Sequence, residues 1–556
     1  MRVENPILAG FHPDPSLIRV GNEYYIASST FEWYPGVRLH RSADLKHWIP
    51  VPGALRTRDL LDMRGVPSSA GIWAPDLSYA DGRFWLVFTV VRQPNNPFKD
   101  VTNYLTWSDS IEGPWASPIR LNGVGFDPSL FHDDDGRKYL VQQTWDHREW
   151  HHAFNGITLT ELDNATFKPK KNTARIIWRG DDTGYIEGPH LYKINGRYYL
   201  FVAQGGTGYS HQEAVARSET LSELSFEGMP DNPLITNIDT PRFGLQKQGH
   251  GSLTNTPDGR WYYASLCARP WHHPEESRID PRGWSSLGRE TSLQEIIWDE
   301  DGWPKVVGGR AGRLVIDVPD AHCAFSDGTA APEECDCSLS TSRLRHQHDD
   351  FESEVLDNEW NTLRVPFDEG MGQVGSGRLI LRGQGSLRDT FELSLVARRW
   401  QAYCFNAQTK IKFVPDTYQA MAGLTNYYND QCWSWAYITY DEKRKCRVID
   451  VAQCDHGVSR TFLRDQAVEI PDDAEWGWLR TRVRCHCYEY DYSFDGASWK
   501  TLPVTLDAKL LTDEYAPTGS CGFFTGAFVG MAAVDYSGYE EPAVFDHFDY
   551  RELDAD

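Results

Sequence analysis

The sequence predicts an all-β protein in which a five-bladed β-propeller is followed by a β-sandwich domain. Three observations predict it: a motif that recurs five times in the first 310 residues, strand-like segments with almost no helical periodicity, and a second series of short strands beyond residue 350. We expect a propeller over residues 1–320, a connection over 321–349 and a jelly-roll-like sandwich over 350–556. A chain of 556 residues exceeds what one hydrophobic core usually supports, which agrees with two domains.

A four-residue motif that ends in leucine defines the repeat. Its copies are Asp14-Pro15-Ser16-Leu17, Ala74-Pro75-Asp76-Leu77, Asp127-Pro128-Ser129-Leu130, Gly188-Pro189-His190-Leu191 and His250-Gly251-Ser252-Leu253. They lie 60, 53, 61 and 62 residues apart. This spacing suits four-stranded sheets repeated around an axis better than a stacked solenoid.

Each copy is followed by a turn and then by a strand that opens with aromatic residues. Asp-Gly or Asn-Gly pairs begin at Asp81, Asp135, Asn195 and Asp258, and Gly21-Asn22 takes this place in the first copy. Such pairs are a strong hairpin signal, because a type I′ turn needs positive φ at two successive residues. The segments 24–28, 84–90 and 198–203 are rich in aromatic and β-branched residues and contain no proline, so we expect strands there.

The first residue of each copy is expected near the propeller axis, because the first strand of a blade lines the central channel. These residues are Asp14, Ala74, Asp127, Gly188 and His250, and Glu187 stands directly before the fourth. Acids that only cap turns would be interchangeable with Asn or Ser. Here three acids and a histidine would share one small volume, where like charges are costly. The cluster therefore indicates a functional site.

Three converging carboxylates without a thiolate or several histidines suit either a hard cation or general acid–base catalysis. A calcium site usually takes its ligands from one loop, whereas these acids come from three blades. Glycoside hydrolysis needs one protonated and one ionised carboxyl group on opposite sides of the scissile bond. A third carboxylate nearby raises the pKa of the acid. Sugar chemistry therefore fits the cluster.

Aromatic residues near the cluster are candidates for the walls of a sugar site, because aromatic faces pack against sugar rings. Phe31 lies in the loop after the second strand, Trp73 adjoins the axis position Ala74, and Trp145 follows the strand over 139–143. The alternative interpretation of each of these aromatic residues is a core residue. That alternative is weakest for Trp73. Arg289 is a candidate for binding a sugar hydroxyl or one of the acids, with a structural ion pair as the alternative.

The second half changes in character. Residues 326–349 are small and polar and indicate a linker or surface excursion. Strand patterns return over 378–381, 393–397, 409–413, 433–439 and 478–483. Tyr488 and Tyr490 alternate with Glu489 and Asp491, as in a half-buried strand. About 200 residues of short strands predict a sandwich. It serves either as a carbohydrate-binding module or as a wall of the active site.

Composition excludes several function classes. The net charge of −24 disfavours nucleic acid and anionic membranes as partners. No run of 18 apolar residues occurs, and the start, Met1-Arg2-Val3-Glu4-Asn5-Pro6, is unlike a secretory signal, so we expect a cytoplasmic protein. Ten of the eleven cysteines lie between Cys323 and Cys521, with no C-x-x-C spacing. Buried thiols in a reducing compartment are thus favoured over a zinc or redox site.

Four motifs resemble glycoside hydrolase family 43. They are Asn5-Pro6-Ile7-Leu8-Ala9-Gly10-Phe11-His12-Pro13-Asp14-Pro15-Ser16, Trp73-Ala74-Pro75-Asp76, Gly125-Phe126-Asp127-Pro128-Ser129 and Glu187-Gly188-Pro189-His190. The likeness covers the whole chain and is greatest to the two-domain β-xylosidases of that family. It implies a five-bladed propeller and an inverting, single-displacement mechanism. Retaining fructosyl-specific relatives start with Asn-Asp-Pro-Asn, whereas this chain has His12-Pro13-Asp14-Pro15, which argues against a fructosidase.

The resemblance also implies roles for individual residues. Asp14 would be the general base, Glu187 the general acid, and Asp127 the residue that tunes the pKa of Glu187. The residues that would line the subsite for the non-reducing sugar are Phe31, Trp73, Trp145 and Arg289. His250 would lie at the channel centre, where some relatives bind a cation. One histidine without carboxylate partners does not support a metal, so we expect no metal and no cofactor.

By the same resemblance, a loop of the sandwich carries an aromatic residue into the mouth of the pocket. We predict that this residue is Phe528, with Phe524 as the alternative. The other interpretation of both residues is that they belong to the core. A blocked channel accepts only chain ends. The predicted function is therefore release of xylose from the non-reducing ends of short xylo-oligosaccharides. The alternatives are an α-L-arabinofuranosidase, alone or combined with that activity, and a non-catalytic sugar-binding propeller. A homo-oligomer is compatible with the sequence.

Overall fold

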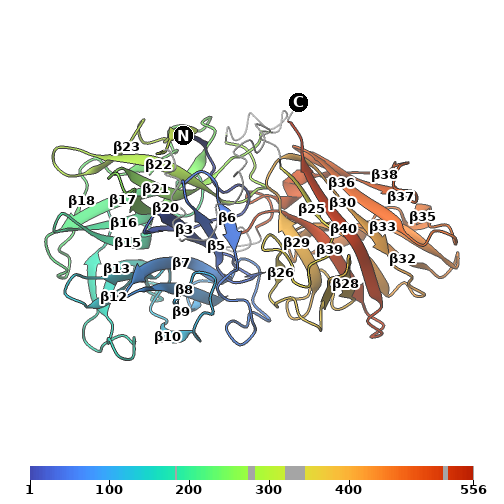
Figure 1. Cartoon of the computed structure of the whole chain (residues 1–556), viewed down its shortest axis with the longest axis horizontal. Coiled ribbons are helices and arrows are strands. Elements are labelled where there is room, and N and C mark those ends of the chain that lie inside the picture. Colours follow the sequence, from blue (N-terminus) through green and yellow to red (C-terminus); the bar gives the residue numbers. More distant parts are fainter. Residues whose placement is uncertain (182–183, 273–281, 320–344, 518–523, 555–556) are drawn as a thin grey trace, which may run out of the picture.

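The chain forms two lobes that lie side by side in the computed structural model (Figure 1). The structure describes residues 1–556 except 182–183, 273–281, 320–344, 518–523 and 555–556. Among the described residues the only helices are two short 3-10 turns, η1 (Arg464–Gln466) and η2 (Ala508–Leu511). In the same part of the chain, no helix has the length and apolar character of a membrane span. The all-β prediction is confirmed.

The first lobe is a propeller of five antiparallel sheets. The first blade contains β2 (Ser16–Val20), β3 (Glu23–Ser28), β5 (Arg38–Ser42) and β6 (Ile49–Val51). The second contains β7 (Gly71–Ala80), β8 (Arg83–Gln93), β9 (Asp100–Ser108) and β10 (Ile119–Asn122). The third contains β11 (Ser129–His132), β12 (Lys138–Trp145), β13 (Phe154–Glu161) and β14 (Arg175–Trp178). The fourth contains β15 (Glu187–Ile194), β16 (Arg197–Gln204), β17 (Gln212–Ser218), β18 (Glu227–Gly228) and β19 (Ile235–Thr236). The fifth contains β20 (Gln246–Asn255), β21 (Trp261–Ala268), β22 (Glu290–Trp298) and β23 (Pro304–Val306).

The five predicted repeats coincide with the five blades. The innermost strands β2, β7, β11, β15 and β20 contact one another in a closed ring around the channel. Each is joined to the next strand of its blade by a turn at the predicted place, although in the copies at Gly21, Asp135 and Asp258 only the glycine has the positive φ expected of two residues. Asp81 and Gly82 have φ values of 56° and 76°, and Asn195 and Gly196 have 51° and 82°. These pairs are the positive-φ turns that their sequence indicates. Near the two ends of the lobe, β1 (Arg2–Glu4) pairs with β24 (Val315–Asp317).

The second lobe is a sandwich of two antiparallel sheets around an apolar core. One sheet contains β25 (His346–Asp349), β27 (Gly372–Val374), β28 (Leu379–Arg382), β40 (Pro542–Glu552), β30 (Cys404–Lys412), β36 (Gly477–Arg484), β37 (Cys487–Ser493) and β38 (Lys500–Asp507). The other contains β29 (Ser394–Arg399), β39 (Phe528–Asp535), β31 (Ala420–Asn429), β32 (Cys432–Asp441), β33 (Cys446–Asp455), β34 (Val458–Thr461) and β35 (Val468–Glu469).

Most of the connection expected over 321–349 lies outside the described residues. Its last four residues, however, form β25, which pairs with β40, so the sandwich begins earlier than residue 350. His346 and His348 lie on this edge strand, and their side chains are 61% and 51% exposed.

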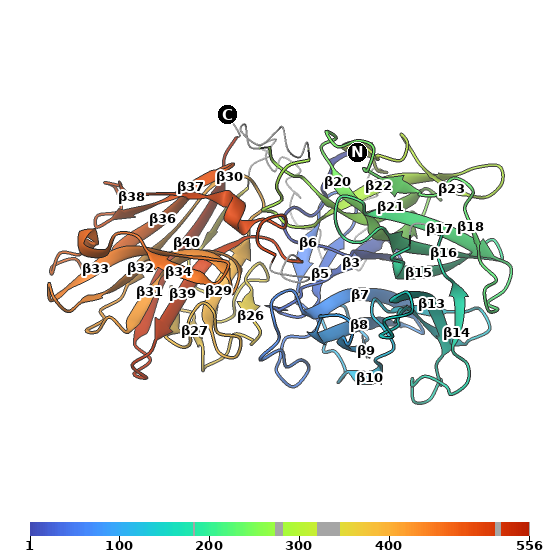
Figure 2. The ribbon, with the colours of Figure 1, turned by 180° about the vertical axis from the view of Figure 1, so that it is seen from behind.

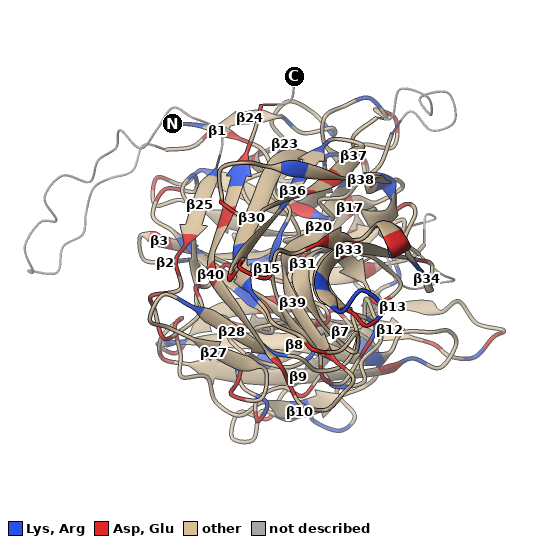
Figure 3. Cartoon of the chain, turned by 90° about the vertical axis from the view of Figure 1, so that its right-hand side faces the viewer, with Lys and Arg blue, Asp and Glu red and all other residues tan. Residues whose placement is uncertain are grey.

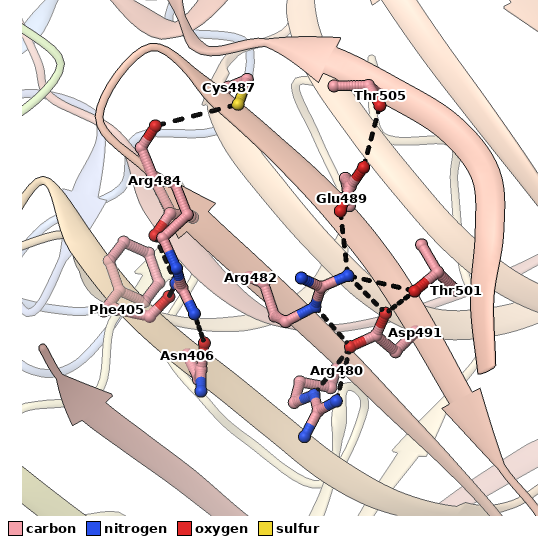
Figure 4. A network of polar contacts seen from close by, with 11 residues as sticks. Phe405, Asn406, Arg480, Arg482, Arg484, Cys487, Glu489, Asp491, Thr501 and Thr505 are labelled. Atoms are coloured by element: carbon pink, nitrogen blue, oxygen red, sulfur yellow. Dashed lines mark hydrogen bonds and ion pairs between the residues drawn. The ribbon is translucent and has the colours of Figure 1, made fainter. Parts of the chain in front are cut away.

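The outer face of the first sheet is polar, as its period-two pattern predicts. Tyr488 and Tyr490 point into the core. On the other face Arg482 donates to Asp491 at 2.7 and 3.1 Å and to Glu489 at 2.9 Å (Figure 4). Opposite charges face each other across β36 and β37, which stabilises their pairing. Figure 3 shows basic and acidic residues interspersed along this lobe.

The second sheet packs against the propeller, and both views of the ribbon place β29 and the short strand β26 (Thr362–Leu363) at the junction (Figure 2). One apolar cluster runs through both lobes and includes Phe11 and Trp33 on one side and Leu395 and Phe528 on the other. The short strands β4 (Trp33–Tyr34) and β26 (Thr362–Leu363) pair across the junction. The two domains therefore share a continuous core.

Candidate active site

A cavity of about 160 Å³ lies where the inner strands of the propeller begin. All five repeats contribute a residue at the axis position or directly before it: Asp14, Trp73, Asp127, Glu187 and His250. The other lining residues are Phe31, Pro94, Asn96, Lys99, Phe126, Trp145, Phe154, Gly206, Thr207, Arg289 and Phe524. Pockets for drug-sized ligands usually measure about 300–1,000 Å³. This one suits a smaller group.

All five axis positions share a left-handed backbone conformation. The φ values are 53° at Asp14, 35° at Ala74, 52° at Asp127, 56° at Gly188 and 45° at His250. The ladder is interrupted beside the axis position in β7, β15 and β20. Non-glycine residues with such φ values are uncommon, and they concentrate at functional sites. The repeat thus turns each chain segment at the same point and aims its side chain at the channel mouth.

The fourth axis position is glycine because a histidine ring occupies the space beside it. A Cβ atom on Gly188 would lie 2.7 Å from the ring of His250. Gly249 likewise gives room to His211, whose ring would lie 2.6 Å from a Cβ atom there. Burial lowers the pKa of His250 to about 4. Its imidazole is therefore neutral near pH 7.

Asp14 is buried and surrounded by groups that favour its ionised form. The Ser29 hydroxyl donates to its carboxylate at 2.6 Å, and Arg289 donates to it at 3.1 Å. His250 Nδ1 lies 3.5 Å from the same carboxylate. Burial alone raises the pKa of Asp14, but Arg289, His250 and Ser29 outweigh it and hold that pKa below its ordinary value. Asp14 is thus a carboxylate.

The pKa values of Glu187 and Asp127 are raised, in contrast to that of Asp14. Burial and the charge of Asp14 raise the pKa of Glu187 to about 7, although Arg289 and Lys99 lower it. Burial, Glu187 and Asp14 raise the pKa of Asp127 well above its ordinary value. The backbone N–H of Gly188 donates to Asp127 at 3.1 Å, which fixes the Asp127 carboxyl beside Glu187.

Near neutral pH the cavity therefore holds an ionised carboxyl group, Asp14, and one that still retains much of its proton, Glu187. Such a pair has the protonation states that general base and general acid catalysis in a single site require. Arg289 acts on the ionised member, because its ion pair with Asp14 stabilises the carboxylate. Arg289 also lines the cavity, so this ion pair lies within the site, and a contact of Arg289 with a sugar hydroxyl stays a prediction.

The predicted aromatic residues Phe31, Trp73 and Trp145 all line the cavity. The centroids of Phe31 and Trp73 lie 6.1 Å apart. Phe524 comes from the sandwich and stacks on Phe31 at 5.6 Å. Arg289 lies over the rings of Phe31 and Phe524, at 5.3 and 5.4 Å from their centroids. The walls therefore present aromatic faces, as sugar rings require.

The choice of Phe528 for the sandwich aromatic is wrong. Its side chain is fully buried and stacks on Trp33, with ring centroids 3.7 Å apart. Phe528 begins β39, and its pairing with Arg399 turns the ring into the shared core of the two domains. Phe524, the alternative, lies before that strand and reaches the cavity.

Several lining residues were not predicted. Lys99 lies in the connection between β8 and β9, where its Nζ is 4.5 Å from the centroid of the Trp145 ring. The indole of Trp145 in turn donates to the carbonyl oxygen of Pro97 at 2.7 Å. Phe154 is the first residue of β13 in the third blade, and Thr207 lies in the loop between β16 and β17 of the fourth. Only Phe126 had a local signal, its place beside Asp127 in a repeat copy.

In the described ranges, no three histidine, cysteine or acidic side chains are arranged as the ligands of a metal ion. Cys267, Cys432, Cys446 and Cys454 are buried free thiols.

Comparisons with known proteins agree with this geometry. Residues 3–304 match the family model of glycosyl hydrolases family 43, and residues 348–551 match that of a beta xylosidase C-terminal concanavalin A-like domain. A beta-xylosidase of Bacillus subtilis is 42% identical over 99% of this chain and 100% of its own length. A xylosidase/arabinosidase of Humicola insolens is 41% identical over 99% of this chain and 98% of its own length.

A solved structure shares the whole architecture. The xylan beta-1,4-xylosidase from Bacillus halodurans superposes with a TM-score of 0.89 at 41% identity, covering 99% of this chain and 100% of that one. The prediction of a five-bladed propeller followed by a sandwich is confirmed.

Proposed function

The chain belongs to glycosyl hydrolase family 43, and we propose that it releases xylose from the non-reducing ends of β-1,4-linked xylo-oligosaccharides with inversion. It is a glycoside hydrolase. The observation that carries the proposal is the division of protonation between two carboxyl groups in one cavity. Asp14 is held ionised, whereas the pKa of Glu187 is raised to about 7.

We assign one step to each group. Asp14 removes a proton from a water molecule, whose oxygen attacks the anomeric carbon. Glu187 gives its proton to the glycosidic oxygen as the bond to the leaving sugar breaks. Because water attacks from the face opposite the leaving group, the configuration inverts in one displacement. Asp127 supports the acid by its position: the Gly188 N–H holds its carboxyl beside Glu187, and the raised pKa of Asp127 keeps that carboxyl largely protonated.

The shape of the cavity supports action at chain ends. Phe524 of the sandwich and the residues Phe31 and Trp73 of the propeller pack together at one side of it. Because this side of the cavity is closed, the terminal sugar fits inside and the rest of the oligosaccharide leaves through the open side. Short xylo-oligosaccharides are therefore the proposed substrates, and hydrolysis by carboxyl groups and water calls for no cofactor.

A second candidate activity is α-L-arabinofuranosidase, alone or together with xylosidase. One relative at 41% identity is named a xylosidase/arabinosidase. The two pentoses present similar hydroxyl groups to a small pocket. The rates on xylobiose, nitrophenyl β-xyloside and nitrophenyl α-L-arabinofuranoside distinguish the activities, and we expect the xylosides to be hydrolysed faster.

The decisive experiment compares Asp14→Asn and Glu187→Gln on two substrates. We expect Asp14→Asn to lower kcat by at least about a thousandfold on both xylobiose and nitrophenyl β-xyloside, because both reactions need the activated water. Glu187→Gln should slow xylobiose hydrolysis by a similar factor and nitrophenyl release much less, because nitrophenolate leaves without a proton.

Two outcomes would overturn the assignment. If both variants keep turnover within tenfold of the parent, the chain is a sugar-binding propeller or uses other residues. If proton NMR detects β-xylose before α-xylose, the reaction retains configuration and Asp14 is not a base acting on water. The cytoplasmic location and a homo-oligomeric state stay predictions from the sequence.

A further inference from the structure

Ser69 connects two walls of the pocket without lining it. It lies fully buried in the loop before β7 and uses all three of its polar groups. Its N–H donates to Glu32 at 3.0 Å, and its carbonyl oxygen accepts from the indole of Trp73 at 3.0 Å. Its hydroxyl oxygen accepts from the backbone N–H of Phe524 at 3.0 Å. One residue thus holds a propeller wall and the sandwich wall.

The backbone of Ser69 is itself held in an uncommon conformation. Its φ is 65°, a left-handed value that costs a non-glycine residue about 1–2 kcal/mol. Such a conformation persists where the surroundings determine it. The bond from Ser69 N–H to the carboxylate of Glu32 is one of those constraints.

Glu32 anchors Ser69 to the second domain. Its side chain is fully buried, and its backbone oxygen accepts from the N–H of Arg364 in the sandwich at 2.8 Å. Burial raises the pKa of Glu32 to about 7, and the charge of Arg364 opposes that rise. In the sequence Glu32 stands between Phe31, which lines the pocket, and Trp33, which packs at the domain junction.

Phe524 is fixed from the other side as well. Its carbonyl oxygen accepts from Arg289 at 3.3 Å, and the same guanidinium donates to Asp14 at 3.1 Å. The Phe524 ring lies 5.4 Å from Trp73. The position of this wall therefore depends on Ser69 at its N–H and on Arg289 at its carbonyl group.

We propose that Ser69 and Glu32 are positioning residues that set the sandwich wall against the propeller and so determine how tightly the pocket holds a chain end. The inference rests on the proposed function, whose substrate it uses. Neither residue lines the cavity, so both act through Trp73 and Phe524. Walls that pack on the sugar before and during reaction contribute uniform binding, which appears in KM rather than in kcat.

The test uses Ser69→Ala and Ser69→Gly. Both remove the hydroxyl acceptor of the Phe524 N–H and keep the backbone bonds to Glu32 and Trp73. Glycine also adopts positive φ without cost. We expect KM for xylobiose to rise about three- to tenfold in both variants, with kcat within about twofold, since one such hydrogen bond contributes about 0.5–1.5 kcal/mol. The Kd of xylose measured by calorimetry should rise by the same factor.

Glu32→Gln and Asp450→Asn form a matched pair of buried carboxylate substitutions. Asp450 accepts from the backbone N–H groups of Val451 and Leu463 in the sandwich, at 2.6 and 3.0 Å. Above pH 7, where Glu32 is mainly ionised, we expect Glu32→Gln to raise KM two- to fivefold, because an amide is a weaker acceptor for Ser69 than a carboxylate. Asp450→Asn should lower the unfolding temperature and leave KM unchanged.

Three results would overturn the inference. KM and the xylose Kd unchanged in both Ser69 variants would leave Ser69 a packing residue only. A parent-like KM in Ser69→Gly but not in Ser69→Ala would assign the effect to backbone strain. A shift of the acidic limb of the pH profile would show that the variants act through Arg289 on Asp14. A parent chain that binds xylose but does not turn over xylobiose contradicts the proposed function instead, and the Kd values still decide the role of Ser69.

Discussion

At the scale of single residues, the active site depends on unequal surroundings for similar groups. Asp14 has a guanidinium and a hydroxyl directed at its carboxylate, whereas Glu187 has mainly burial and the negative charge of Asp14. The charge of Asp14 therefore shifts the pKa of Glu187 in the required direction, whereas Arg289 and Ser29 keep Asp14 ionised. An ionised base favours a protonated acid, because two like charges in a low-dielectric cavity resist ionising together.

Lys99 helps to set the highest pH at which Glu187 keeps its proton. Its positive charge lowers the pKa of Glu187, so a neutral side chain there should raise that pKa. A protonated acid would then persist to higher pH. In Lys99→Met we expect the alkaline limb of kcat/KM for xylobiose to move upward by about 0.5–1 pH unit, near the low end of the effect of a close opposite charge.

The pH profile of initial rates measures this shift. Lys305→Met is a suitable control, because Lys305 pairs with Asp231 at the surface, at 3.1 Å. Its profile should match that of the parent. An alkaline limb that stays in place or moves downward in Lys99→Met would contradict the role of Lys99.

At the scale of elements, a residue with left-handed backbone conformation lies in or just before each inner strand and directs the chain toward the axis. Gly188 shows that one of these positions has no space for a side chain. Its N–H donates to Asp127 at 3.1 Å, and a Cβ atom on it would lie 2.7 Å from the ring of His250. We expect Gly188→Ala to cost about 1–3 kcal/mol from crowding in addition to the cost of its φ of 56°, and to lower kcat, since Asp127 would move.

Gly196→Ala is the matched control in the same blade. Gly196 has a φ of 82° in the turn between β15 and β16, with no atom within 4 Å of its Cβ position. That variant should lose only the roughly 1–2 kcal/mol of the backbone conformation and keep its kcat. Urea unfolding and initial rates provide both comparisons. Equal loss of stability and equal kcat in the two variants would show that the contact with His250 is unimportant.

The strands and loops also show which features of the fold and of the site could be predicted from one sequence. The strands and turns were predictable because hairpin signals such as Asp81-Gly82 are local. Asp14 and Asp127 were predictable because they occupy equivalent places in a repeat, and Glu187 because it directly precedes the equivalent place Gly188. Lys99 and Ser69 were not, since each lies in an irregular loop whose path depends on packing with other segments. Phe524 and Phe528 were interchangeable in sequence, because only the pairing of β39 with β29 determines which ring enters the domain core.

At the scale of the molecule, the two domains are joined by buried charge as well as by apolar packing. Lys247 of β20 lies 3.2 Å from Asp513 and 2.8 Å from Glu514, two residues of the sandwich, and its side chain is 5% exposed. Burial raises the pKa of Asp513 to about 6, although Lys247 lowers it. Tyr428 donates to Asp513 at 2.8 Å. The cation thus allows two carboxyl groups to be buried at the junction.

Lys247→Met should destabilise the whole chain in a pH-dependent way. Removing one partner of a buried pair costs about 3–5 kcal/mol, because the other partner remains buried without compensation. Without Lys247 the pKa of Asp513 rises further above its unfolded value. A group whose folded pKa is raised favours the folded state at low pH, and that contribution is lost as pH rises through the folded pKa. The variant should therefore lose the full amount near pH 8 and clearly less near pH 5.

Urea unfolding at the two pH values measures the difference, with Lys412→Met as the control. Lys412 pairs with Glu475 at the surface, at 2.6 Å, and removing an exposed pair changes stability by at most about 1 kcal/mol at either pH. If Lys247→Met lost the same free energy at both values, proton uptake by the junction carboxyls would not contribute, and Lys247 would stabilise the junction through packing alone. If the loss is larger near pH 8, charge compensation between the domains sets the stability of the molecule that holds Phe524 in the pocket.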